Sequence, residues 1–185
     1  MKKTTCFFAA TLVYLSVSAQ CYSGDCENGT GTYHFENGDE YSGQFLNNKT
    51  TGIGYYRWAE GSQYYGEMLN GILHGLGLYA AAGAEKWTYG NWQNNELAEE
   101  LSFAAGSCIV GDCEDGAGIY MDEEGNIYAG EYSNGTKTGY GRLNGMDASI
   151  YIGFFADGWF NGQGLLINPD GTREEGEFTG GYLKN

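Results

Sequence analysis

The chain has 185 residues, of which 32 are Gly and only 1 is Pro. The single Pro excludes collagen and polyproline structure, and the 16% share of aromatic residues argues against a disordered chain, which would lack the apolar groups that offset the entropy cost of ordering. The formal net charge of −15 argues against binding to nucleic acid or to an anionic membrane, since both require basic residues.

The N-terminal segment, residues 1–19, has the features of a signal peptide. Lys2 and Lys3 form a basic region, a mostly apolar run follows over residues 6–17, and small residues precede the predicted cleavage site after Ala19. The apolar run is too short to cross a membrane. We therefore expect an exported protein of bacterial type, periplasmic or extracellular, and cleavage would change the net charge from −15 to −17.

Four cysteines remain after cleavage and form two pairs of equal spacing, Cys21 with Cys26 and Cys108 with Cys113. An even number in an exported chain predicts disulfides. Metal binding is the alternative, but neither of the 2 histidines recurs with the cysteines. Each pair encloses a Gly-Asp dipeptide that suits a tight reversal, which predicts a bond within each pair and no metal site. Lipidation of Cys21 is disfavoured, because Gln20 stands where such a site has a small residue.

Glycines repeat every 23 residues through residues 20–103, as in Gly29, Gly52 and Gly75. Aromatic residues alternate with other residues between these glycines, and a strand places alternate residues on one face. Asn-Gly and Asn-Asn pairs separate the alternating segments and favour tight turns. Each unit is therefore predicted to be a β-hairpin, and residues 20–103 to form a first half-array of hairpins.

The second half-array, residues 104–185, repeats the first. Residues 21–33 recur as residues 108–120, an offset of 87 positions. The array is interrupted between the halves, where residues 96–104 are predicted to form either an irregular hairpin or one short helical turn. The sequence leaves open whether the two half-arrays form one continuous sheet.

Gly and Tyr are abundant together because a ring needs bare backbone beneath it. Gly weakens a strand, but it leaves room for an aromatic ring to lie flat over neighbouring backbone. We predict that such rings form an aromatic ladder that supplies the core of a thin sheet, with a binding surface as the alternative role. The ladder consists of Tyr41, Phe45, Tyr56, Trp58, Tyr64, Tyr79, Tyr120, Tyr128, Tyr132, Tyr151 and Phe155.

This pattern resembles the MORN (membrane occupation and recognition nexus) repeat. Segments of the form Tyr-x-Gly-x-aromatic lead into Gly-x-Gly segments, as from Tyr41 to Tyr56 and from Tyr128 to Gly141. The resemblance covers nearly all of residues 29–182. It implies an all-β fold, a single-layer elongated antiparallel meander sheet of consecutive hairpins, and a role in protein interaction or scaffolding. It also implies membrane association for some members, which the negative charge of this chain disfavours.

No set of residues indicates catalysis. With 2 histidines and no Gly-x-Ser-x-Gly motif, the chain offers no candidate triad. The Gly-x-Gly pairs lack the Lys and the following helix of a phosphate-binding loop. We therefore predict that the protein is not an enzyme and binds no cofactor or metal. A hydrolase that uses two of the 24 acidic residues is the third reading, although no pair stands out.

The sheet face opposite the ladder supplies the candidate interaction surface. An apolar residue on that face of a single layer has no core to join, so we expect it to meet a partner. The residues concerned are Tyr55, Tyr65, Ile152 and Phe154. The predicted function is a protein-interaction or scaffold module, with a protein partner or self-association. An aromatic-lined glycan-binding module is the alternative.

Overall fold

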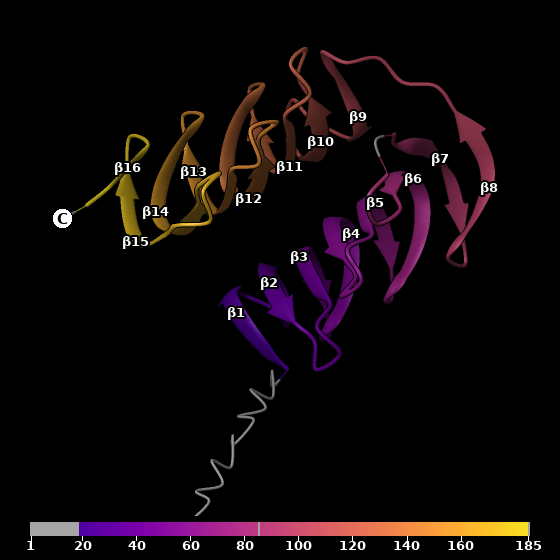
Figure 1. Ribbon diagram of the computed structural model, residues 1–185, viewed down its shortest axis with the longest axis horizontal. Coiled ribbons are helices and arrows are strands. Elements are labelled where there is room, and N and C mark those ends of the chain that lie inside the picture. Colours follow the sequence, from indigo (N-terminus) through magenta and orange to yellow (C-terminus); the bar gives the residue numbers. More distant parts are fainter. Residues whose placement is uncertain (1–18, 85, 185) are drawn as a thin grey trace, which may run out of the picture.

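The computed structural model describes residues 19–84 and 86–184, so the predicted signal peptide lies, apart from Ala19, outside the described residues. The described chain forms 16 strands in two antiparallel sheets of 8, with no helix and therefore none that is long and apolar enough to cross a bilayer. Within each sheet the strands follow one another in chain order (Figure 1). The predicted all-β meander of consecutive hairpins is confirmed.

The two sheets have eight consecutive strands each. The first sheet contains β1 (Gln20–Gly24), β2 (Thr30–His34), β3 (Glu40–Leu46), β4 (Lys49–Arg57), β5 (Gln63–Leu69), β6 (Ile72–Ala80), β7 (Thr88–Gln93) and β8 (Glu96–Leu101). The second sheet contains β9 (Ser107–Gly111), β10 (Ala117–Met121), β11 (Ile127–Ser133), β12 (Thr136–Asn144), β13 (Ile150–Ala156), β14 (Trp159–Ile167), β15 (Arg173–Thr179) and β16 (Tyr182–Leu183). Residues 96–101 are thus a strand, and they do not form the helical turn that was one of the two expectations.

Asparagine-rich turns close the hairpins. Asn47 and Asn48 between β3 and β4 have φ values of 52° and 60°, and Asn70 between β5 and β6 has 52°. Asn134, between β11 and β12, has a φ of 49°. Asn tolerates this left-handed conformation better than most residues, which is why these dipeptides fix where each strand ends and the next begins.

A tyrosine ring lies across glycine backbone at the centre of a repeat. Gly43 and Gly54 face each other in the β3–β4 ladder, and a Cβ built on Gly54 would lie 2.5 Å from the hydroxyl oxygen of Tyr41. The ring therefore fills the volume that a larger residue would need. The Tyr41 hydroxyl donates hydrogen bonds to the carbonyl oxygens of Gln44 and Thr51, each at 3.0 Å. The same arrangement of ring over glycine recurs at Tyr64, Tyr128 and Tyr151.

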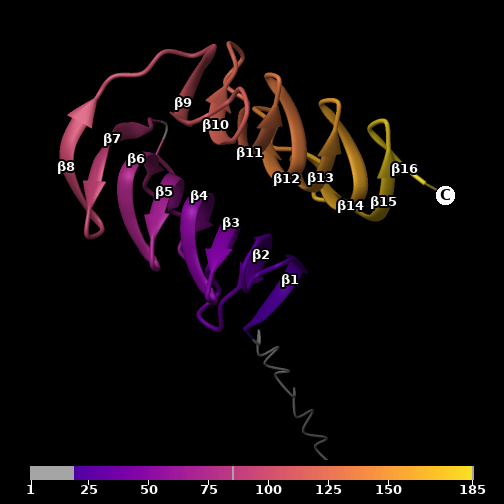
Figure 2. The same ribbon diagram turned by 180° about the vertical axis from the view of Figure 1, so that it is seen from behind.

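The chain reverses direction between the two sheets. After β8 the segment 102–106 leads into β9, and the second sheet runs back along the first (Figures 1 and 2). β3 contacts β12, β4 contacts β10 and β11, and β6 contacts β9. The half-arrays therefore form two facing layers, and they do not join into one continuous sheet.

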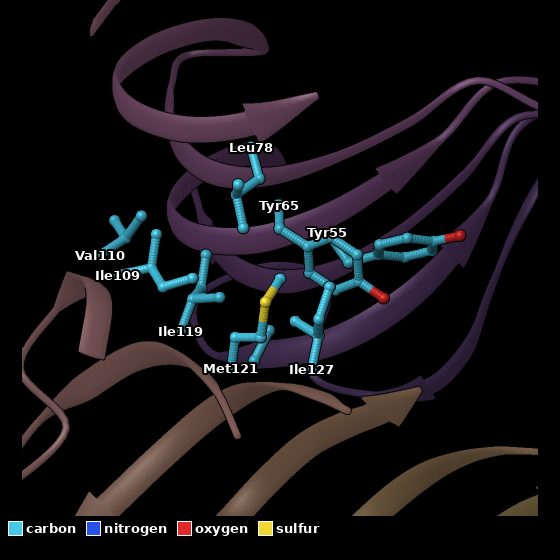
Figure 3. Close-up of a cluster of buried hydrophobic side chains, with 9 residues drawn as sticks. Tyr55, Tyr65, Leu78, Ile109, Val110, Ile119, Met121 and Ile127 are labelled. Carbon is cyan, nitrogen blue, oxygen red and sulfur yellow. The ribbon is translucent and has the colours of Figure 1, made fainter. Parts of the chain in front are cut away.

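Apolar side chains from both sheets form one buried cluster between the layers (Figure 3). Tyr55, Tyr65 and Leu78 of the first sheet pack with Ile119 and Ile127 of the second. Burial of apolar surface is the main favourable term in folding, so this cluster is what holds the layers together.

This second layer corrects the prediction for the face opposite the ladder. Tyr55, Tyr65 and Ile152 are 1%, 0% and 5% exposed, so they lie in the core and offer no free surface. Phe154 alone stays 42% exposed. The prediction was wrong because it assumed a single layer. Strand parity assigns a residue to a face, but it does not say whether another sheet covers that face.

Candidate functional site

The aromatic ladder lies on the outer face of each sheet, away from the contact between the sheets. Its most buried members occupy matching positions in the two halves: Tyr41 and Tyr64 in the first, Tyr128 and Tyr151 in the second, each at most 1% exposed. Burial raises the pKa of all four hydroxyls. The other buried members are Phe45, Tyr132 and Phe155.

A second set of rings on the first sheet is only half buried and forms a continuous row. The ring centroids of Phe35 and Tyr56 are 5.8 Å apart, those of Tyr56 and Trp58 4.7 Å, and those of Trp58 and Tyr79 6.0 Å. Tyr79 continues to Trp92 at 5.6 Å. Phe35, Tyr56, Trp58 and Tyr79 are called the aromatic row below.

The second sheet lacks this row. The positions 87 residues later hold Asp122, Leu143, Gly145 and Leu166. The backbone there is equivalent, since Tyr41 pairs with Tyr56 across β3 and β4 just as Tyr128 pairs with Leu143 across β11 and β12. The two halves thus share the buried tyrosines but not the half-buried rings. Leu143 and Leu166 still pack against the core of the second sheet, so the hairpins need apolar contact at those positions but not an aromatic ring.

A buried carboxylate fixes the middle of the row. The Tyr56 hydroxyl donates to Oδ2 of Asp39 at 2.7 Å, and the backbone N–H of Ala59 donates to Oδ1 at 2.9 Å. Burial alone would raise the pKa of Asp39, but these hydrogen bonds outweigh it and lower that pKa. The carboxylate therefore stays ionised and holds both the ring of Tyr56 and the turn that carries Trp58.

Shallow acidic grooves flank the aromatic row. One groove of about 510 Å³ is lined by Phe35 together with Asp25 and Glu27. Another of about 550 Å³ is lined by Trp58 together with Glu60. Aromatic faces attract both apolar groups and cations, and the carboxylates add attraction for positive charge. This surface is therefore suited to a ligand that is apolar and basic.

All three arginines of the chain line a cleft of about 650 Å³ between the two sheets. Arg142 is 3% exposed. Its Nη1 donates to Oε1 of Glu40 at 2.6 Å, and its guanidinium carbon lies 3.8 Å from the centroid of the Tyr55 ring. Arg57 lies 3.7 Å from the same carboxylate, and Arg173 is exposed at the cleft mouth. The charges of Arg142 and Glu40 join the layers, since a buried charge needs a partner.

The predicted disulfides are present in the structure. Cys21 is bonded to Cys26 and Cys108 to Cys113, each pair with its Cα atoms 5.9 Å apart. Over residues 19–84 and 86–184 no group of three or more His, Cys, Asp or Glu side chains could hold a metal ion. The cysteines therefore serve as local clips at the start of each sheet.

The alternation of residues along the strands does not separate the aromatic row from the ladder. It places Tyr56, Trp58 and Tyr79 with the buried rings, and it does not single out Phe35. Tyr120 is also half buried and lies beside the Cys108–Cys113 disulfide. The signal that separates the two sets was present in the sequence, because rings required by the hairpin occur in both halves and the others occur in one.

Five segments of the chain match the family model of the MORN repeat: residues 22–40, 41–63, 64–82, 128–146 and 151–173, together more than half of the chain. No curated protein matches the sequence. Among solved structures, the chain is similar to the TCP domain of SAS-4 (dCPAP) of Drosophila melanogaster, solved in complex with a proline-rich motif of Ana2 (dSTIL). The identity is 12% and the TM-score 0.27, over 95% of this chain and 97% of that one. On the evidence of its five matched repeats, the chain belongs to the MORN repeat family.

Proposed function

We propose that this protein is a non-enzymatic, exported interaction module whose first sheet binds a basic protein segment across the aromatic row. The observation that carries the proposal is the restriction of the row to one half. Both halves build the same hairpins over the same buried tyrosines, and the second half does so without rings at the row positions, so the hairpins do not require aromatic residues there. Half-buried rings at the centre of a surface are typical binding hot spots.

The charge of the chain supports a basic occupant. The net charge is −15, and the grooves beside the row carry Asp25, Glu27 and Glu60. Arg and Lys side chains can stack on the exposed faces of Trp58 and Tyr79 while their charges meet these carboxylates. An acidic partner would be repelled by the same groups.

Export is part of the proposal. The N-terminal residues have the pattern of a signal peptide. The two disulfides support the same compartment, because such bonds persist in oxidising environments and are rare in the cytosol.

The test uses short synthetic peptides of matched length and apolar content that carry Arg and Lys, Glu, or no charge. Fluorescence anisotropy should show binding of the basic peptides to the wild-type protein, weakened by salt. The double variant Trp58→Gly Tyr79→Leu carries the residues of the second half at two row positions. It should lose about tenfold or more in affinity, as expected when hot-spot residues are removed. Tyr182→Ala removes a ring that is 80% exposed outside the row and should change nothing.

Two results would overturn the proposal: equal binding of the three peptide classes, or full binding by the double variant. Self-association through the row is a competing outcome, detected as a change in sedimentation between the wild type and the double variant without any peptide. A glycan array on the same pair of proteins tests the other alternative. Glycan binding that disappears in the double variant would replace the protein partner with a saccharide.

A further inference from the structure

The two disulfides border pockets that occupy the same place in the two halves. A pocket of about 880 Å³ lies beside Cys108–Cys113 on the outer face of the second sheet, and one of about 510 Å³ lies beside Cys21–Cys26 on the first. Every residue that lines the smaller pocket has its counterpart, 87 positions later, in the lining of the larger one. The two pockets can therefore be compared residue by residue, and the smaller one shows which side chains the fold accepts at each position.

Polar side chains replace apolar or neutral ones in the larger pocket. Asp122 stands where the first half has Phe35, and Tyr132 stands where it has Phe45. Lys137, in the pocket wall, takes the position of the buried Thr50. The fold accommodates the first-half residues at all three positions, so their replacement by groups that are costly to bury needs a separate reason.

Two polar groups in this wall, one buried and one half-buried, have no polar partner among the described residues. The Tyr132 hydroxyl is buried and makes no hydrogen bond with any described residue, whereas its counterpart Phe45 has no hydroxyl. The Lys137 ammonium forms no ion pair within the described part of the chain and lies 5.3 Å from the centroid of the Tyr128 ring. Burial lowers the pKa of Lys137. Folding alone would favour Phe45 over Tyr132. The hydroxyl of Thr50 is itself buried without a partner, so the comparison of the halves distinguishes Tyr132 most clearly.

The carboxylates around the pocket divide into two kinds. Asp112 accepts hydrogen bonds from the backbone N–H groups of Glu114 and Asp115, and Asp122 accepts two from Asn126, each at 2.7 Å. These two carboxylates shape their own turns. The side chain of Glu114 makes no hydrogen bond within the described residues, so it is free to accept one from a ligand.

The charges of the lining residues indicate which class of ligand the pocket can hold. Asp112, Glu114 and Asp122 would repel an anion, a cation would satisfy these carboxylates but leave the Lys137 ammonium without an acceptor, and an apolar group would leave all four charges without partners. A neutral ring with several hydroxyls satisfies all of them, because hydroxyls accept from an ammonium and donate to a carboxylate. The half-buried ring of Tyr120 offers an apolar wall for the C–H face of such a ring. We propose that the pocket beside Cys108–Cys113 binds one sugar unit of an uncharged glycan.

The test is calorimetric titration of the disulfide-intact protein with neutral disaccharides: cellobiose, maltose and diacetylchitobiose. A disaccharide of galacturonic acid serves as the anionic probe and one of glucosamine as the cationic probe. At least one neutral disaccharide should bind. Lys137→Thr, which restores the first-half residue, should lower its affinity by about tenfold through loss of a charged hydrogen bond. Lys184→Thr removes an exposed lysine elsewhere and controls for net charge. Near-ultraviolet circular dichroism checks the fold of each variant.

A second pair of variants separates this site from the aromatic row. Asp122→Phe should also weaken saccharide binding, whereas Trp58→Gly Tyr79→Leu should leave it intact, since the row lies on the other sheet. The proposal is overturned if no neutral disaccharide binds, if only the charged probes bind, or if Lys137→Thr binds as tightly as the wild type. None of these results would bear on peptide binding at the row.

Discussion

The guanidinium of Arg142 in the second sheet lies 2.6 Å from the carboxylate of Glu40 in the first. The two side chains are 3% and 13% exposed, and His34 and Arg57 approach the same carboxylate at 3.3 Å and 3.7 Å. Burial alone would raise the pKa of Glu40, but His34, Arg142 and Arg57 together lower it from 4.5 to about 2. Glu40 thus gathers two neighbours from its own sheet and one arginine from the second sheet, and its contact with Arg142 connects the layers.

Acid should weaken the fold through Glu40. Its pKa is depressed in the folded state, so its stabilising contribution is complete above about pH 4.5 and is lost as the pH falls towards about 2. The shift corresponds to about 3 kcal/mol. Urea unfolding of the wild type and of Glu40→Gln should give a difference in unfolding free energy that shrinks by about that amount between neutral pH and pH 2. A difference that does not depend on pH would contradict this.

Replacing Arg142 should lower the free energy of unfolding by more than replacing an exposed arginine does. Arg142→Met leaves the carboxylate of Glu40 buried with a weaker set of partners, and breaking such a pair costs about 3 kcal/mol. Arg173→Met, at the exposed mouth of the same cleft, should change stability by less than about 0.5 kcal/mol. Chemical denaturation at neutral pH measures both. Equal losses of stability in the two variants would show that the buried ion pair of Arg142 contributes no more than an exposed arginine.

Valine at the central glycines should destabilise both sheets. A Cβ built on Gly54 or on Gly141 lies 2.5 Å from the hydroxyl oxygen of Tyr41 or Tyr128 respectively, so each ring must move. Overpacking of this kind costs about 1–3 kcal/mol. Thermal melting of Gly54→Val and Gly141→Val should show it, with Ser133→Val at an exposed position as the control. Melting temperatures that match the control would mean that the rings do not rest on these glycines.

The oxidised protein should contain the same two disulfides as the structure. Peptide mapping without reductant is expected to recover Cys21 with Cys26 and Cys108 with Cys113. Each bond closes a short loop, so reducing one should cost on the order of 2 kcal/mol. The sheets do face each other, yet a bond between Cys26 and Cys113 is not expected, because each lies on the outer face of its own sheet. A Cys26–Cys113 peptide would therefore contradict the two-layer arrangement.

Export makes a separate prediction about the N-terminus. Expression of the full chain in a bacterium with a periplasm should yield a mature protein that begins at Gln20, determined by intact mass and N-terminal sequencing. Retention of Lys2 and Lys3 in a cytoplasmic product with free thiols would contradict both the signal peptide and the compartment.

The local structure could be predicted from the sequence because it depends on neighbours in the chain. The 23-residue period located hairpins, Asn-rich turns and rings over glycines such as Tyr41 over Gly54. The reversal after β8 could not be predicted, since nothing in a repeat says what packs on the face opposite the ladder. One signal was available: Tyr55, Tyr65 and Ile152 are apolar on the face opposite the ladder, and strands that are apolar on both faces are typical of sheets buried on both sides.

The facing sheets give the duplicated sequence the character of a dimer enclosed in one chain. Segment 102–106 links the two copies, so each meets the other at a high effective concentration. Two separate chains would lose translational entropy on forming the same contact. Each copy covers the inner face of the other, so neither inner face is open to a binding partner. The outer faces stay uncovered, and they carry different side chains in the two halves, with aromatic rings on one and a charged pocket on the other.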